Sequence, residues 1–296
     1  MSTERKSYPS DLTDEQWAVV GPLLEILCPP KVKGKPRSVD LREVLNTILY
    51  QARSGCQWDM LPHDLLAKST VYDYFARWRD DGTLEALHRS IVAMTRRAET
   101  DAAGRPRDPD PTAASIDSQS VEATQACEDR GYDAGKKVSG RKRHIAVDTL
   151  GLILAAVVTV AGVQDADAAE LLVDRLTIDE QVNLEVVWAD GGYHRKKLYE
   201  YIEEHPRVFW ELEVIKRPAG VRGFEVLPKR WVVERTFAWL DRWRRMSKDY
   251  ERRKDSAEAW IQICSVGRMV RYLKPAPGIA KFRYPQKAAE NAVLAS

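Results

Sequence analysis

The sequence predicts an α/β protein in which a mixed sheet flanked by helices follows an all-helical region. Three observations support this fold class. Apolar residues recur at helical spacing up to about residue 95, whereas strand-like and helical segments alternate from residue 113 onward. Between these regions, residues 96–115 are rich in proline and almost free of large apolar side chains. That composition is typical of a linker.

Four helices are predicted before the linker, at about residues 13–27, 40–55, 70–82 and 84–98. Thr13 and Gln16 have the spacing of a capping box, which satisfies backbone donors at a helix start. Gly55 is placed to end the second helix, and Ser69 is expected to cap the third.

The third predicted helix has one apolar face and one polar face. Val71, Phe75 and Trp78 share a buried face, which leaves Arg77 and Arg79 pointing outward. Because a short connection precedes this helix, the pattern favours a helix-turn-helix variant that would bind DNA through these arginines. An ordinary helical bundle is the alternative interpretation.

Five strands and four helices are predicted after the linker. The strands lie within residues 112–123, 143–149, 152–162, 183–190 and 207–216, and the helices within 166–176, 195–205, 229–246 and 257–273. Three strands followed by alternating helices and strands indicate a mixed five-stranded sheet covered by helices. The predicted organisation is a helical domain at 1–95, a linker at 96–112, an α/β domain at 113–275 and a tail at 276–296.

Three carboxylates occupy unusual positions in this pattern. Asp117 lies inside the first strand, Asp190 ends the fourth, and Glu234 belongs to a polar stripe on the helix predicted at 229–246. Burying a carboxylate at a strand is costly unless something neutralises it. Three such groups at neighbouring strand ends would repel one another, but they would hold divalent cations such as Mg²⁺ or Mn²⁺ well. A pair of these ions can activate a water or a 3′-hydroxyl at a phosphodiester. On the helix alone, a solvated stripe with an Arg230–Glu234 ion pair is the alternative.

Several segments resemble those of bacterial insertion-sequence transposases of the DDE type. They are "SIDSQSV", "GRKRHIAVDTLGLIL", "WADGGYHRKKL" and "RWVVERTFAWLDRWRRMSKDYE", preceded by "LTDEQWAVVGPLL", "ILYQARSGCQWDMLP" and "STVYDYFARWRDDG". The resemblance covers about residues 8–275. It implies a ribonuclease-H-like catalytic core, two Mg²⁺ ions for which Mn²⁺ can substitute, and DNA strand cleavage and transfer. Carried over by motif, Asp117, Asp190 and Glu234 are the catalytic and metal-binding triad.

The chain departs from the signature of the group that it resembles, which is Tyr-x2-Arg-x3-Glu-x6-Lys. Arg230 and Glu234 match, but Leu227 stands at the tyrosine position and Asp241 at the lysine position. Arg242, Arg244 and Arg245 are close enough in sequence to supply the missing positive charge. The phosphate-binding partner on this helix is therefore expected to differ from the family pattern.

Basic residues gather in the sequence around the three carboxylates. Between residues 216 and 254 there are 13 basic and 5 acidic residues, although the whole chain has a net charge of only +2. A polyanionic backbone is the natural partner of such clusters, with solvated surface as the alternative. The residues predicted to bind DNA are Arg77, Arg79, Lys136, Lys137, Arg141, Lys142, Arg143, Arg195, Lys196, Lys197, Arg230, Trp231, Arg242 and Arg245.

Cysteine spacing and apolar runs suggest the compartment. The four cysteines lie far apart without a CxxC pair, which disfavours a zinc site or a disulfide framework and fits a reducing cytosol. The longest apolar run, 152–163, is too short to span a membrane, and the N-terminus lacks the apolar core of a signal peptide. The expected setting is the bacterial cytoplasm, in association with the nucleoid and without a membrane partner.

The expected partner is double-stranded DNA, both the terminal inverted repeats of a transposon and the target. Because coupled attack on two strands usually needs two protomers, a homodimer assembled on DNA is expected. Two rival functions remain open: a DNA-binding regulator that keeps the fold without catalysis, and a nuclease without strand transfer. Intact carboxylates at all three positions disfavour the regulator.

Overall fold

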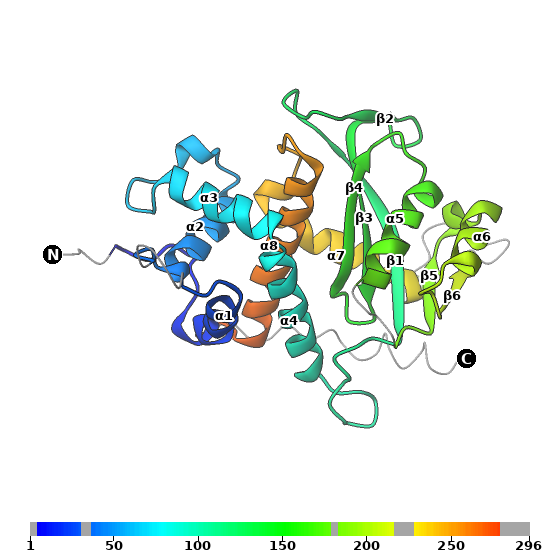
Figure 1. Ribbon diagram of the computed structural model, residues 1–296, viewed down its shortest axis with the longest axis horizontal. Helices are drawn as coiled ribbons and strands as arrows, with labels where there is room; N and C mark the ends of the chain where they lie inside the picture. The colour runs from blue at the N-terminus through cyan, green and yellow to red at the C-terminus, as the bar shows by residue number, and fades with distance from the viewer. Residues whose placement is uncertain (1–4, 31–36, 179–182, 216–227, 279–296) are drawn as a thin grey trace.

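Helices gather on one side of the computed structural model and the sheet lies on the other (Figure 1). The structure describes residues 5–30, 37–178, 183–215 and 228–278. The helical side is built from α1 (Asp14–Leu27), α2 (Leu41–Ser54), the short 3₁₀ helix η1 (Trp58–Met60), α3 (Lys68–Asp80), α4 (Thr83–Arg97) and α8 (Lys254–Leu273). None of the described helices is both long and apolar enough to cross a membrane.

The sheet is mixed, and its order is β2-β3-β1-β5-β6 with β4 also paired to β3. Its strands are β1 (Ala113–Glu122), β2 (Gly131–Asp133), β3 (Val138–Asp148), β4 (Ile153–Val160), β5 (Val186–Ala189) and β6 (Glu211–Val214). β3 is antiparallel to β1, β2 and β4, whereas β1, β5 and β6 are mutually parallel neighbours. This order and the flanking helices agree with the ribonuclease-H-like architecture expected from the sequence.

Four further elements complete the α/β side, namely α5 (Asp165–Ile178), the 3₁₀ helix η2 (Gly191–Tyr193), α6 (Lys196–Glu204) and α7 (Pro228–Leu240). A last 3₁₀ helix, η3 (Arg244–Met246), follows α7. The five predicted strands correspond to β1, β3, β4, β5 and β6. The sixth, β2, was not predicted because it has only three residues and no apolar run.

The predicted helix starts and ends were partly right. Thr13 accepts a hydrogen bond from the backbone N–H of Gln16, and the Gln16 side chain closes the capping box. Gly55 ends α2 in the left-handed conformation at φ 70°, which a residue without Cβ adopts at little cost. The expected cap at Ser69 is wrong, because α3 already begins at Lys68 and its N-cap, Ala67, makes no side-chain bond.

The helix predicted at 229–246 is shorter than expected. α7 ends at Leu240, and Trp243 then takes an extended conformation at φ −95° and ψ 118°. Trp243 is buried in the core after this turn. In a helix that continued to residue 246, Asp241 and Arg245 would share the face of Glu234. Because α7 ends at Leu240, they do not continue that face.

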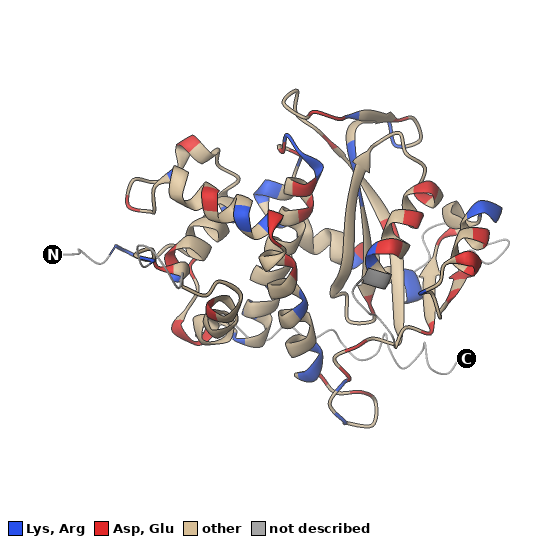
Figure 2. Ribbon diagram, viewed as in Figure 1, with Lys and Arg blue, Asp and Glu red and all other residues tan. Residues whose placement is uncertain are grey.

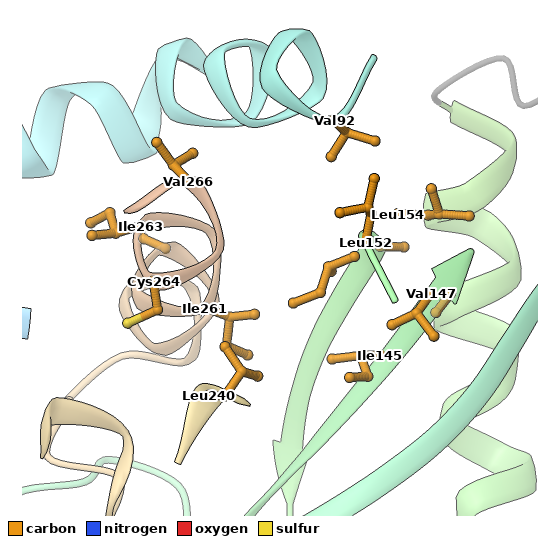
Figure 3. Close-up of a cluster of buried hydrophobic side chains, with 14 of the residues drawn as sticks. Val92, Ile145, Val147, Leu152, Leu154, Leu240, Ile261, Ile263, Cys264 and Val266 are labelled. Atoms are coloured by element: carbon orange, nitrogen blue, oxygen red, sulfur yellow. The ribbon is translucent and has the colours of Figure 1, made fainter. Parts of the chain in front are cut away.

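One continuous core joins the helices to the sheet. Figure 3 shows Val92 of α4, Ile261 of α8 and Leu240 of α7 on the side that faces Ile145 and Val147 of β3. Near the centre of the helical side, the Trp260 ring of α8 stacks on Phe75 of α3 with their centroids 5.0 Å apart. Burying each large apolar side chain contributes about 1.5–3 kcal/mol to folding.

α8 therefore contacts both regions of the molecule. It packs on α1, α2, α3 and α4 as well as on β4 and α7. Since the sequence places this helix in the α/β domain, the boundary predicted near residue 95 does not separate two independent cores. The division into domains at 1–95, 96–112, 113–275 and 276–296 stays a prediction, and most of the tail lies outside the described residues.

Candidate active site

The register of the two central parallel strands brings two aspartates together. β1 and β5 run parallel, and Ser115 pairs with Trp188. Asp117 and Asp190 each lie two residues beyond that pair, so they lie side by side where β5 ends and point to the same face of the sheet. Because β5 ends at Ala189, Asp190 is free to act as the N-cap of η2, where its Oδ1 accepts a hydrogen bond from Gly192 at 2.7 Å.

Helix α7 packs on β1 and brings a third carboxylate and an arginine close to Asp117 and Asp190. Glu234 and Arg230 are one turn apart on α7. The Arg230 Nη2 atom lies 3.4 Å from an Asp190 oxygen, 3.7 Å from a Glu234 oxygen and 3.9 Å from an Asp117 oxygen. Asp117, Asp190 and Glu234, hereafter the carboxylate cluster, thus surround a single guanidinium nitrogen.

Asp117 is the most strongly perturbed acid of the carboxylate cluster. Burial raises its pKa to about 6, and the nearby Asp190 charge adds to that rise. A hydrogen bond from the Ser118 backbone N–H and the positive charge of Arg230 oppose the shift. At neutral pH the site therefore holds a partly buried carboxylate that gains from any additional cation.

A buried hydroxyl without a partner lies beneath the carboxylate cluster. Tyr193 is fully buried, and its hydroxyl makes no hydrogen bond within the described part of the chain. Burial, together with the charges of Asp117, Asp165 and Asp190, raises the pKa of this phenol. An unsatisfied buried hydroxyl costs about 1–3 kcal/mol, so a bound water or ion ligand in this place would relieve it. No periodic pattern in the sequence points to Tyr193.

The residues of the site fit a divalent cation by their chemistry. Three carboxylates and no sulfur or nitrogen ligand form a donor set that suits Mg²⁺ or Mn²⁺. Among the described residues, no three acidic, histidine or cysteine side chains are drawn together closely enough to hold a metal. The Nη2 atom of Arg230 lies among the acids at 3.4–3.9 Å. Mg²⁺ would draw its ligands to about 2.0–2.1 Å.

A second polar network supports β1 from the opposite face of the sheet. The Ser118 hydroxyl donates to Asp165 at 2.7 Å, and Lys142 Nζ lies 3.0 Å from the same carboxylate. The hydrogen bond from Ser118 lowers the pKa of Asp165, with Lys142 adding to it, although burial acts in the opposite direction. The carboxylate of Asp165, at the start of α5, thus anchors the strand residue that follows Asp117.

Three of the predicted DNA contacts on β3 are contradicted by their burial. Arg141 donates to the backbone carbonyls of Asp129, Glu251 and Arg252. Arg143 donates to two further backbone carbonyls, and Lys142 is held by Asp165, Asp133 and a carbonyl. All three side chains are buried. β3 pairs with β1, β2 and β4 and packs against α5 and α7, so its cations bind groups in the interior rather than at the surface.

Two arginines elsewhere are also engaged inside the protein. Arg245 is buried, and its guanidinium donates to Glu251 and to the Cys56 carbonyl. The Arg79 guanidinium is almost covered and bonds to Asp80 and Ser256. Arg245 is therefore contradicted as a DNA contact, and Arg79 ties α3 to α8 instead of pointing outward as the spacing predicted.

The remaining predicted DNA contacts lie at the surface. Exposed positions are held by Arg77, Lys136, Lys137, Arg195, Lys196, Lys197 and Arg242. Trp231 is 36% exposed, whereas Trp243 packs in the core. In Figure 2, basic and acidic residues are interspersed over both regions of the molecule. The role of the exposed residues in DNA binding stays a prediction.

Replacing Arg143 by methionine tests whether this residue of β3 stabilises the interior or binds DNA. We expect a loss of about 1–3 kcal/mol in the free energy of unfolding, because the Met246 and Lys248 carbonyls lose their donor. The salt dependence of DNA binding should not change. The matched variant is Lys137→Gln, which removes an exposed charge and should lower the salt slope by about one without affecting stability. A reduced slope and unaltered stability in Arg143→Met would restore the surface assignment.

Comparison with known proteins gives three matches. Residues 108–266 match the family described as "Transposase DDE domain". Residues 12–88 match a second family, described as "Putative transposase of IS4/5 family". A relative from Burkholderia cepacia, named "Putative transposase for insertion sequence element IS402", is 34% identical over 134 residues, which are 42% of this chain and 60% of the relative. The chain thus spans about 60% of the length of that relative. No solved structure matches.

Proposed function

This chain belongs to the bacterial insertion-sequence transposases with a DDE domain, and from that premise we propose that it cuts and joins DNA at the carboxylate cluster. The proposed reaction is hydrolysis of a phosphodiester at each transposon end, followed by attack of the freed 3′-hydroxyls on target DNA. Asp117, Asp190 and Glu234 are the proposed ligands of two Mg²⁺ ions, with Mn²⁺ as a substitute.

One observation carries this proposal. Three carboxylates, from β1, from the end of β5 and from α7, lie within 3.4–3.9 Å of one guanidinium nitrogen. Asp117, Asp190 and Glu234 are separated by 73 and 44 positions in the chain. Because like charges repel, bringing these carboxylates together is costly, and a cation-binding role would account for that cost. Two bound ions would activate the attacking oxygen and stabilise the leaving oxygen of the phosphodiester.

The chain's own residues have distinct proposed tasks. The three carboxylates orient the ions, and the Gly192 N–H fixes the Asp190 side chain through its hydrogen bond to Oδ1. Gly191 and Gly192 keep the turn after Asp190 free of large side chains, which leaves room for a DNA backbone. Arg230 is partly exposed beside the ligands, so its guanidinium can reach a phosphate close to the reacting bond.

The proposed DNA partners are the terminal inverted repeats and the target duplex. The proposed phosphate contacts are the exposed basic residues, namely Arg77 on α3, Lys136 and Lys137 before β3, Arg195, Lys196 and Lys197 around the start of α6, and Arg242 after α7. We propose that the helical side binds the repeats, and that two copies of the chain assemble on a pair of ends. Because the repeats and the target would lie in the chromosome of the host, we propose that the protein associates with the nucleoid.

The decisive experiment is cleavage and joining of labelled duplexes taken from the DNA that flanks the gene. With Mg²⁺ we expect nicked ends followed by products joined to target DNA, and with EDTA we expect neither. Nicking without joining would point to a nuclease. Specific binding of the ends without any cutting, in either Mg²⁺ or Mn²⁺, would point to a DNA-binding regulator.

A further inference from the structure

Arg230 occupies the centre of the carboxylate cluster without making a close pair with any member of it. The Nη2 atom is the closest guanidinium atom to each acid, at 3.4 Å from Asp190, 3.7 Å from Glu234 and 3.9 Å from Asp117. A committed arginine–carboxylate pair usually has two N–H···O contacts at about 2.7–2.9 Å. Arg230 thus supplies charge to three acids at once, and its one hydrogen bond to the cluster is a long one, from Nη2 to Asp190 Oδ2 at 3.4 Å.

The same space cannot hold this guanidinium and a divalent ion. Mg²⁺ brings its oxygen ligands to about 2.0–2.1 Å, which would require the three acids to close over the point where Nη2 lies. The two cations would also repel each other across a few ångströms of partly buried space. A divalent ion that enters the cluster must therefore displace the guanidinium.

The position of Arg230 follows from the fold. It precedes Glu234 by one turn on α7, and α7 packs on β1, so docking of the helix sets both side chains over the strand ends. The side chain is partly exposed, with 19% of its surface accessible. A long side chain anchored at its Cα can swing from the acids to an incoming phosphate, two of whose oxygens can accept parallel hydrogen bonds from the planar guanidinium.

We propose that Arg230 is the internal counter-cation of the metal-free protein and moves to a DNA phosphate when divalent ions enter the carboxylate cluster. Metal binding and DNA binding are then positively coupled through Arg230. A metal ion that displaces the guanidinium frees it for a DNA phosphate, and a phosphate that holds the guanidinium leaves the acids open to a metal ion. Linkage requires the effect to be reciprocal. The free protein binds ions weakly, and the protein on DNA binds them well. This inference rests on the proposed function of the same site.

The test measures Mn²⁺ binding to the full chain by the electron paramagnetic resonance signal of free Mn²⁺. Without DNA, Arg230→Gln should bind Mn²⁺ about tenfold more tightly than the unchanged protein, since it removes a positive charge a few ångströms from the ion. The matched variant Arg235→Gln removes the same charge from the same helix. Its guanidinium donates to the Leu150 carbonyl, so its Mn²⁺ affinity should stay close to that of the unchanged protein.

A second measurement tests the same coupling by adding DNA. Adding duplex DNA should raise the Mn²⁺ affinity of the unchanged protein by a factor similar to that of Arg230→Gln, and should raise the affinity of Arg230→Gln much less. Asp190→Asn with the same DNA gives the amount of Mn²⁺ that DNA binds by itself.

Two negative results have different meanings. In the first, Arg230→Gln binds Mn²⁺ no more tightly than the unchanged protein, while Asp190→Asn abolishes Mn²⁺ binding. This result would overturn the counter-cation role and leave the metal site intact. No Mn²⁺ binding that depends on Asp190, with or without DNA, would overturn the metal site and the proposed function together with the inference.

Discussion

Asp190→Asn is expected to lower the rate of metal-dependent end cleavage by at least about 1,000-fold, equivalent to about 4 kcal/mol of transition-state stabilisation. The amide keeps the shape of the side chain and still accepts the Gly192 N–H bond, but it lacks the charge that a divalent ion requires. Asp117→Asn and Glu234→Gln should have effects of the same order. Binding of the DNA ends should survive in all three variants, because it depends on residues elsewhere.

The control for these variants is Glu122→Gln. Glu122 lies on β1 with Asp117, but its carboxylate is exposed and pairs with Lys248 away from the carboxylate cluster. This variant should cleave and join the ends at the rate of the unchanged protein. Cleavage that persists at full rate in Asp190→Asn would show that the carboxylate cluster does not hold the catalytic ions.

The second large effect concerns an ion pair that connects the helical side to the sheet. Arg96 near the end of α4 pairs with Asp148 at the end of β3, and both side chains are buried. Asp148 Oδ1 also accepts the backbone N–H groups of Leu150 and Leu152 at 2.9 and 2.8 Å. Asp148→Asn keeps an acceptor for the turn but leaves a buried guanidinium without its counter-charge. The expected loss is about 3–5 kcal/mol in the free energy of unfolding.

Denaturant unfolding of a double-mutant cycle checks this value. The combination of Arg96→Met with Asp148→Asn should lose clearly less than the sum of the two single losses, since no buried charge then remains unpaired. The exposed pair of Arg252 and Glu128 serves as a comparison, and Glu128→Gln should have little effect on stability. Strictly additive losses in the cycle would show that Arg96 and Asp148 are not coupled.

Much of the fold could be predicted from local patterns. The capping box of Thr13 and Gln16, the terminal Gly55 and the apolar face of Val71, Phe75 and Trp78 depend on residues within a few positions of one another. Such features follow from the repeat of a helix or strand. The five longer strands were found in the same way, whereas β2 escaped because a three-residue strand leaves no pattern.

The three acids of the candidate site were also visible in the sequence, as carboxylates at strand ends and on a polar helix stripe. Their convergence was an inference from the predicted strand order together with a resemblance. The parallel register of β1 and β5 and the docking of α7 supply the physical basis for that convergence. Their catalytic role stays a prediction until cleavage is measured.

What each side chain touches was decided by the tertiary structure alone. The charge run at Arg141, Lys142 and Arg143 looks like a DNA surface in sequence, yet β3 is a central strand covered on both faces, so these cations meet buried carbonyls and acids. The end of α7 at Leu240 and the pairing of Arg96 with Asp148 have the same origin. Composition and periodicity fix the local conformation and the sign of each charge. The partners of a charge come from residues distant in the chain, and only folding brings them within reach.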